Sequence, residues 1–120
     1  MLLVACSAPA PKPVTCPATA QHEPRRALDD PSGAAIEGLI RDDNACAPLA
    51  AATVIVTGPG TQIPVLSGDD GRYLVPGLMP GNYKMTIYFC DGWTERDVAV
   101  IGGYATRVDV VMTVQCRGEI

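Results

Sequence analysis

The sequence predicts an all-β fold, a seven-stranded antiparallel β-sandwich that begins near residue 36. Three observations predict it. Apolar and polar residues alternate along several segments, as at Tyr83, Met85 and Ile87, and this alternation places one face of a strand on a core and the other in solvent. Turns rich in glycine and proline separate short segments at regular intervals. No window repeats apolar residues at the spacing of a helix face.

The expected strands are short, and β-branched residues dominate several of them, as in the run TVIVT at residues 53–57. Glycine or proline marks most of the breaks, because glycine reaches positive φ and proline fixes φ near about −65°. The expected strands cover residues 36–41, 53–57, 62–66, 72–75, 82–89, 94–101 and 105–114.

Residues 76–81 are expected to carry the chain from one sheet to the other. Pro76-Gly77 and Pro80-Gly81 each interrupt strand pairing, because proline lacks the N–H group that a strand ladder needs. Leu78, between the two breaks, is expected to plug the end of the core. Residues 82–89 then form the centre of the second sheet.

Residues 7–35 are expected to form a proline-rich flexible tether ahead of the sandwich. Six of the 11 prolines fall in the first 35 residues, among small and polar residues in no periodic order. Such a segment buries too little apolar surface to offset the entropy of ordering its backbone, which predicts a disordered N-terminal tail. The sandwich is assigned to residues 36–116, and residues 117–120 form a short C-terminal tail.

The first six residues, MLLVAC, contain the run Leu3-Val4-Ala5-Cys6, which resembles the lipobox of bacterial lipoproteins. The resemblance implies that residues 1–6 are the remnant of a signal and that Cys6 carries a lipid. The protein would then be anchored in a bacterial cell envelope, at the outer membrane or periplasmic face, or be secreted. A basic start and a full apolar run are missing, so an ordinary apolar N-terminus is the alternative.

The other cysteines, an even number, suit disulfide bonds in an oxidising compartment. Their spacing contains no CxxC pair, which argues against a zinc ribbon or a thioredoxin-type site. Four cysteines allow three connectivities, and the sequence alone does not choose among them. The four candidates are Cys16, Cys46, Cys90 and Cys116.

Three motifs follow one another along the expected sandwich: GLIRD at residues 38–42, DGRY at 70–73 and PGNY at 80–83. Through these motifs, residues 36–114 resemble the sequence pattern of the carboxypeptidase regulatory-like domain. Ala51 departs from the pattern, which favours glycine there, and the turn is therefore expected to be less tight. The resemblance implies a seven-stranded, prealbumin-like Greek-key sandwich.

In a sandwich with this strand order, successive strands alternate direction, so Cys46, Cys90 and Cys116 fall at one end. A disulfide is therefore expected among these three, with Cys46–Cys90 favoured, and Cys16 is expected to reach back to the third.

Trp93 follows Asp91-Gly92, where the family commonly places an aromatic residue that covers the end of the core. The resemblance therefore implies a structural role for this side chain. The alternative is a sugar-stacking platform formed with Tyr88 and Tyr104, an idea raised by the sandwich shape of several carbohydrate-binding modules.

Reactive chemistry is not indicated. His22 is the only histidine and lies in the expected tail, so no catalytic residues and no cofactor are predicted. Asp42-Asp43 and Asp69-Asp70 could contribute calcium ligands, but turn aspartates normally bind their own backbone, and no metal site is assigned. The net charge of −4, without a Lys/Arg cluster, argues against nucleic acid as a partner.

Two functions remain from different classes. The first is a non-catalytic, envelope-anchored sandwich that supports or docks an envelope protein, for example by adding a partner strand to a sheet edge. The second is a carbohydrate-binding module that recognises envelope or environmental glycans.

Overall fold

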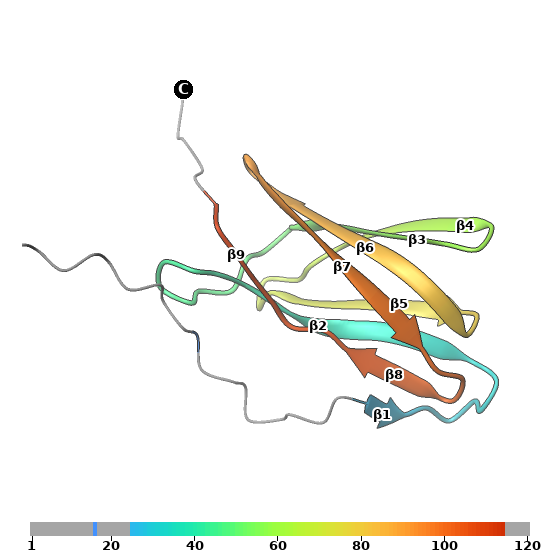
Figure 1. Cartoon of the computed structure of the whole chain (residues 1–120). Coiled ribbons are helices and arrows are strands. Elements are labelled where there is room, and N and C mark those ends of the chain that lie inside the picture. The colour runs from blue at the N-terminus through green and yellow to red at the C-terminus, as the bar shows by residue number, and fades with distance from the viewer. Residues whose placement is uncertain (1–15, 17–24, 115–120) are drawn as a thin grey trace, which may run out of the picture.

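The computed structural model describes Cys16 and residues 25–114, and within them the chain forms strands and turns without a helix (Figure 1). The strands are β1 (Arg25–Ala27), β2 (Ala34–Asp42), β3 (Thr53–Gly58), β4 (Thr61–Leu66), β5 (Arg72–Leu78), β6 (Gly81–Phe89), β7 (Gly92–Val100), β8 (Tyr104–Arg107) and β9 (Val110–Met112).

The strands form two sheets that face each other as a sandwich, which confirms the all-β, two-layer expectation (Figure 1). One sheet has the order β1-β8-β2-β5, with β9 also paired to β2, and the other has the order β4-β3-β6-β7. Most pairs are antiparallel, but β2 pairs in parallel with both β8 and β9. The chain changes sheet between β5 and β6, as expected, and β6 lies inside the second sheet.

The expected last strand, residues 105–114, is divided into β8 and β9. Both β8 and β9 still run alongside β2, because hydrogen bonds of the two residues between them, Val108 and Asp109, connect the chain to β2. The Val108 N–H donates to the Glu37 carbonyl at 2.8 Å, and the Asp109 carboxylate accepts from the Leu39 N–H at 2.9 Å. The division therefore changes the strand count without changing the path of the chain.

The expected break at Pro76-Gly77 does not end a strand, since β5 continues to Leu78. The pairing of β5 with β2 shifts register between Ala34 and Ile36, and Gly77 adopts a φ of 73°. This irregularity in the pairing allows the strand to continue through Pro76, as is common for proline in edge strands. Leu78 is buried at the end of the core, as expected.

The expected flexible tether, residues 7–35, is wrong for residues 25–35, while residues 7–15 and 17–24 lie outside the described residues. Strand β1 pairs antiparallel with β8, and a disulfide joins Cys16 to Cys46 in the turn that follows β2. The composition did indicate too little apolar surface for independent order. Cys16 is held instead by a covalent bond, and residues 25–27 are held by the hydrogen-bonding edge of β8.

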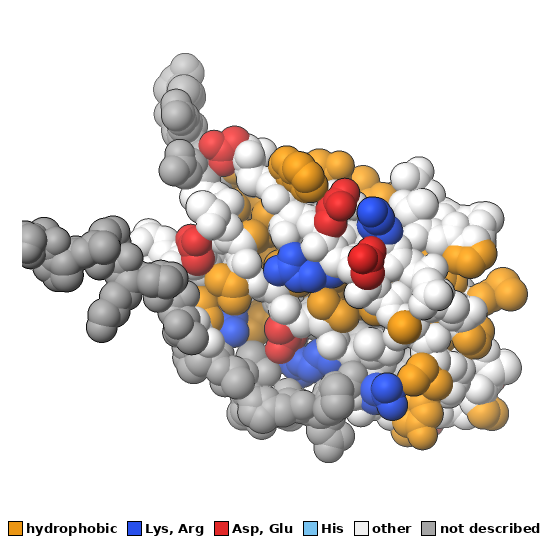
Figure 2. Space-filling view, in the orientation of Figure 1, with side chains coloured by type: hydrophobic (Ala, Val, Ile, Leu, Met, Phe, Trp, Pro, Cys, Tyr) orange, Lys and Arg blue, Asp and Glu red, His pale blue; other side chains and the backbone are white. Residues whose placement is uncertain are grey.

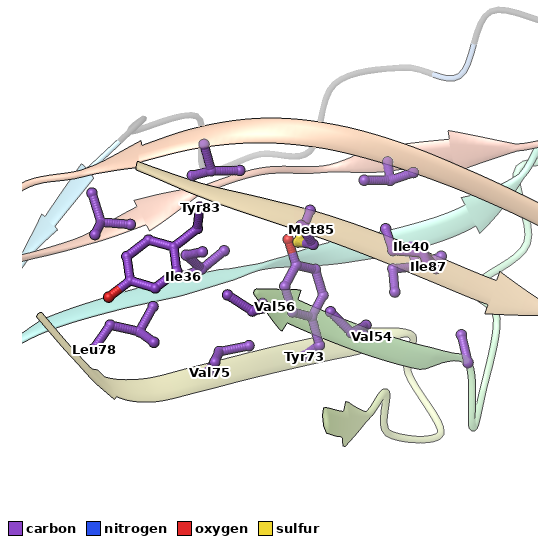
Figure 3. Packing of buried hydrophobic residues seen from close by; sticks show 14 of the residues in the cluster. Ile36, Ile40, Val54, Val56, Tyr73, Val75, Leu78, Tyr83, Met85 and Ile87 are labelled. Atoms are coloured by element: carbon purple, nitrogen blue, oxygen red, sulfur yellow. The ribbon is translucent and has the colours of Figure 1, made fainter. Parts of the chain in front are cut away.

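The core lies between the sheets and is built from the inward-facing positions of both (Figure 3). In β6, Tyr83, Met85 and Ile87 point inward, and the residues between them point outward. The largest fully buried side chains are Ile36, Ile40, Met85, Ile87, Val54, Val56, Val75 and Val110.

Ala51 lies in a tight turn between β2 and β3 and adopts a φ of 61°. The turn is closed by hydrogen bonds to Ser67, whose carbonyl accepts from the Ala51 N–H at 3.0 Å. The buried Ser67 hydroxyl adds bonds to the Ala52 N–H and the Leu49 carbonyl. The expectation of a looser turn is therefore wrong, because the alanine takes up the left-handed conformation that glycine adopts at lower cost.

We expect Ala51→Gly to raise the free energy of unfolding by about 0.5–1 kcal/mol, because it relieves a left-handed alanine and costs only some backbone entropy. Chemical denaturation at neutral pH measures the change. Ala45 is an exposed turn residue without a positive φ, so Ala45→Gly is the control and should not stabilise the protein. Destabilisation by Ala51→Gly would contradict the prediction.

Tyr73 is buried under the connection between β8 and β9. Its hydroxyl donates to the Val108 carbonyl at 2.6 Å, and a Cβ added to Gly38 would lie 1.9 Å from the same oxygen. Glycine in the GLIRD motif therefore permits this close approach. Burial, reinforced by the charge of Asp109, raises the pKa of Tyr73 far above its usual range.

We expect the protein to lose stability as the pH rises above about 10, because Tyr73 ionises there in the unfolded chain but stays neutral when folded. Since the folded pKa is the higher one, this contribution is complete below pH 10 and declines above it. Denaturation midpoints between pH 7 and 11 measure the slope. Tyr73→Phe should flatten it and cost about 1 kcal/mol at pH 7. An unchanged alkaline slope in that variant, with Tyr104→Phe as the exposed control, would contradict the assignment.

Candidate binding face

A row of outward-pointing side chains crosses the outer face of the sheet β4-β3-β6-β7. Leu66 lies opposite Thr53, Thr53 lies opposite Tyr88, and Tyr88 lies opposite Trp93. Leu66 is 64% exposed, Tyr88 46% and Trp93 61%. These four residues, here called the cross-sheet row, place one apolar or aromatic side chain on three of the four strands.

The alternation along the strands sets the direction of these side chains. Tyr88 follows the buried Ile87 in β6 and therefore points away from the core. Trp93 holds the equivalent outward position in β7, directly across from Tyr88. Residues directly opposite each other in antiparallel strands have Cβ atoms about 5 Å apart, so the two rings are neighbours.

The structural role expected for Trp93 is wrong, because its side chain does not cover the end of the core. The chain that follows β9 occupies that place. A Cβ added to Gly92 would lie 2.5 Å from the Thr113 carbonyl oxygen and 3.1 Å from the Val114 side chain. Because Thr113 and Val114 already cover this end of the core, the Trp93 side chain lies on the outer face of the sheet.

Tyr104, the third expected stacking residue, is separated from the other two. It begins β8 in the opposite sheet and pairs there with Ala27. Sequence reasoning also missed Leu66 and Thr53, which complete the row. Their outward positions follow from the alternation, but their alignment with Tyr88 depends on the strand register, which the sequence does not show.

Charged residues lie beyond the row, on the same face of β6 and β7. Lys84 pairs with Glu95 at 3.7 Å and lies opposite Asp97. Figure 2 shows acidic and basic side chains gathered along this hairpin, with hydrophobic ones at its tip. The face therefore has an aromatic end and a charged end.

The disulfide Cys16–Cys46 corrects the expected Cys46–Cys90 pairing. The β2–β3 and β6–β7 connections, which contain Cys46 and Cys90, do lie at the same end of the sandwich, as expected (Figure 1). Cys90 is also disulfide-bonded, and its partner is outside the described residues, as are Cys6 and Cys116.

Two of the turn aspartates, Asp42 and Asp70, bind their own backbone, as expected, whereas the Asp43 carboxylate accepts from the Thr113 hydroxyl. The Asp42 carboxylate accepts from the N–H groups of Asn44 and Ala45, and that of Asp70 accepts from the Arg72 N–H. Among residues 25–114 and Cys16, no group of three or more His, Cys, Asp or Glu side chains is placed to hold a metal. The same part of the chain contains no helix that could span a membrane. His22 falls outside it.

A family model for the carboxypeptidase regulatory-like domain matches residues 35–113. No curated protein sequence is similar enough to count as a match. Among solved structures, the Bacillus anthracis TIE protein has a TM-score of 0.61 at 14% identity over 68% of this chain and 16% of its own. This chain therefore corresponds to a small part of that protein.

A second similar structure is the dioxygenase domain of a dioxygenase carbohydrate-binding protein fusion from the cellulolytic bacterium Streptomyces sp. SirexAA-E. It has a TM-score of 0.54 at 14% identity and covers 70% of this chain and 81% of its own. A cohesin–X-dockerin complex from Acetivibrio cellulolyticus has a TM-score of 0.47 at 20% identity, over 67% of this chain and 57% of its own. At these identities the similarity shows the fold alone.

We expect Trp93→Ala to change the free energy of unfolding by less than about 1 kcal/mol, because an exposed cross-strand pair contributes little. Urea denaturation measures the change. Met85→Ala, in the core of the same sheet, is the contrast and should cost about 2–5 kcal/mol. A core-sized loss in Trp93→Ala would mean that the side chain serves packing rather than binding.

Proposed function

Because the chain belongs to the carboxypeptidase regulatory-like domain family, we propose that it is a non-catalytic binding module held at a cell envelope, where it docks another protein. The observation that carries this function is the exposed cross-sheet row. Adjacent Tyr and Trp side chains supply large contact area at low entropic cost, and residues of this kind dominate protein interfaces.

Two of the sheet edges are poorly suited to the strand addition expected from the sequence. Strand β4 forms one edge of its sheet and contains Pro64, opposite Ile55 of β3. Strand β5 forms an edge of the other sheet and contains Pro76. Proline offers no N–H group to an incoming strand, and natural proteins use it to protect edges.

A lipid on Cys6 would hold the domain close to the membrane. The Cys16–Cys46 bond attaches the chain to the domain at Cys16, which leaves residues 7–15 between the lipid and the domain. At roughly 3 Å per residue, this segment spans no more than about 30 Å. The end of the sandwich that carries Cys46 would then face the membrane, and disulfide bonds suit an extracytoplasmic compartment.

A second candidate function is glycan binding, which the adjacency of Tyr88 and Trp93 favours. Two neighbouring aromatic rings on a flat sheet can stack against successive sugar rings. The charges nearest to them include Glu95 and Asp97, which would repel acidic sugars. A neutral glycan is therefore the ligand that this alternative predicts.

The two functions are separated by one set of variants of the full chain with its disulfides intact. Membrane extracts and a glycan array are probed with the protein, with Trp93→Ala and with Thr57→Ala, a control on the same face. We expect the protein to recover a specific protein partner. Trp93→Ala should weaken that binding roughly 30-fold, as hot-spot residues do, and Thr57→Ala should not.

Glycan binding that Trp93→Ala abolishes would support the second function instead. Recovery of no specific partner, together with a blank array, would contradict both. Mass spectrometry of the mature protein purified from membranes tests the anchor separately, and an unmodified Cys6 would contradict envelope tethering through this residue.

A further inference from the structure

The charges around the cross-sheet row indicate which kind of side chain its partner presents. The row lies where its four strands meet the β2–β3, β4–β5 and β6–β7 connections. These connections, residues 43–52, 67–71 and 90–91, contain no Lys or Arg but contain Asp43, Asp69, Asp70 and Asp91. A partner that approaches the row therefore meets negative charge, which favours a partner with a basic contact surface.

One carboxylate also lies on the same face as the aromatic pair. Glu95 is two residues after Trp93 in β7, and both side chains point away from the core. At about 3.3 Å per residue, the two positions are about 7 Å apart along the strand. A cationic side chain that rests on the indole ring is therefore within reach of the Glu95 carboxylate.

The neighbouring cations leave Trp93 and Glu95 accessible. Lys84 pairs with Glu95 at 3.7 Å, but both side chains are about half exposed, and exposed pairs contribute little to stability. Arg96 points to the other side of β7. There its guanidinium group donates to the Thr94 hydroxyl at 2.7 Å and to the Glu95 carbonyl at 2.8 Å. Trp93 therefore remains exposed beside a carboxylate that can exchange its partner.

We propose that the protein docked by the cross-sheet row places an arginine side chain on Trp93, where it also pairs with Glu95; this inference rests on the docking function proposed above. A guanidinium group is planar, so it can stack on an aromatic ring and offer two parallel N–H groups to a carboxylate. Lysine fits this site less well, because its charge is compact and its donors do not form a fork. Tyr88, beside Trp93, supplies ring surface for apolar residues that flank the arginine.

An arginine contact differs measurably from the neutral glycan of the second candidate function. A neutral sugar that stacks on Trp93 carries no charge, so its affinity depends little on salt. An arginine uses both Trp93 and Glu95, and its affinity falls as salt rises, because exposed charges are screened. Removing the charge from either Glu95 or the ligand therefore weakens binding only if the ligand is cationic.

The test begins with the full chain, its disulfides intact, as the target for a library of random peptides displayed on phage. Phage that bind the protein but not Trp93→Ala are sequenced, and we expect arginine with apolar neighbours to be enriched among them. Because Trp93 is the only tryptophan, its fluorescence then measures the affinity of a selected synthetic peptide at this site.

A double-mutant cycle tests the contact itself. We expect Glu95→Gln, or citrulline in place of the peptide arginine, to weaken binding roughly fivefold each, and the two together to weaken it little further. Asp97→Asn removes the same charge from the same face, four residues from Trp93, and should change the affinity less than about twofold. Added salt should weaken binding of the arginine peptide and not of the citrulline peptide. Equal urea midpoints for all variants exclude misfolding.

The outcomes separate this inference from the docking function on which it rests. Selected peptides without arginine, or with lysine in its place, would overturn the inference and leave docking through the row intact. Additive effects of Glu95→Gln and citrulline would do the same, as would equal effects of Glu95→Gln and Asp97→Asn, which would indicate general attraction to negative charge. A selection that yields no peptide dependent on Trp93 would contradict both the inference and the docking function.

Discussion

The packing of β6 against the facing sheet is the constraint on which both the core and the binding face depend. Tyr83, Met85 and Ile87 fill the interior, and side chains in a strand alternate strictly between faces. Their burial therefore forces Tyr88 outward, toward Trp93 of β7. A slip of one residue would expose the core residues and bury Tyr88. The outward positions of Tyr88 and Trp93 therefore follow from the packing of the core, and no additional interactions are needed to set them.

Much of this architecture could be predicted from the sequence, because its determinants are local. Alternation and turn residues identify β3, β4, β6 and β7 to within a few residues, and the burial of Leu78 follows from its place between two prolines. The division of the last strand could not be predicted. It depends on the Asp109 side chain, which binds the backbone of a strand 70 residues away in the sequence.

The site was harder to predict, because it depends on distant partners. The sequence suggests that Trp93 covers the end of the core, but Thr113 and Val114 pack against that end instead. The position of Cys16 near Cys46 and the pairing of β1 with β8 are equally long-range. The composition of a segment indicates whether it can fold alone. It does not indicate whether the segment will pair with the edge of a distant strand or form a disulfide with a distant cysteine.

The short strand β1 has a consequence for how this domain can be shortened. It occupies the edge of β8 that would otherwise present unpaired N–H and C=O groups to solvent. A shorter version that began after Ala27 would lose both this cover and the Cys16 crosslink. Its open β8 edge could then pair with the open β8 edge of a second copy, and such edge-to-edge pairing would give dimers and aggregates. The N-terminal segment therefore acts as a built-in guard against self-association.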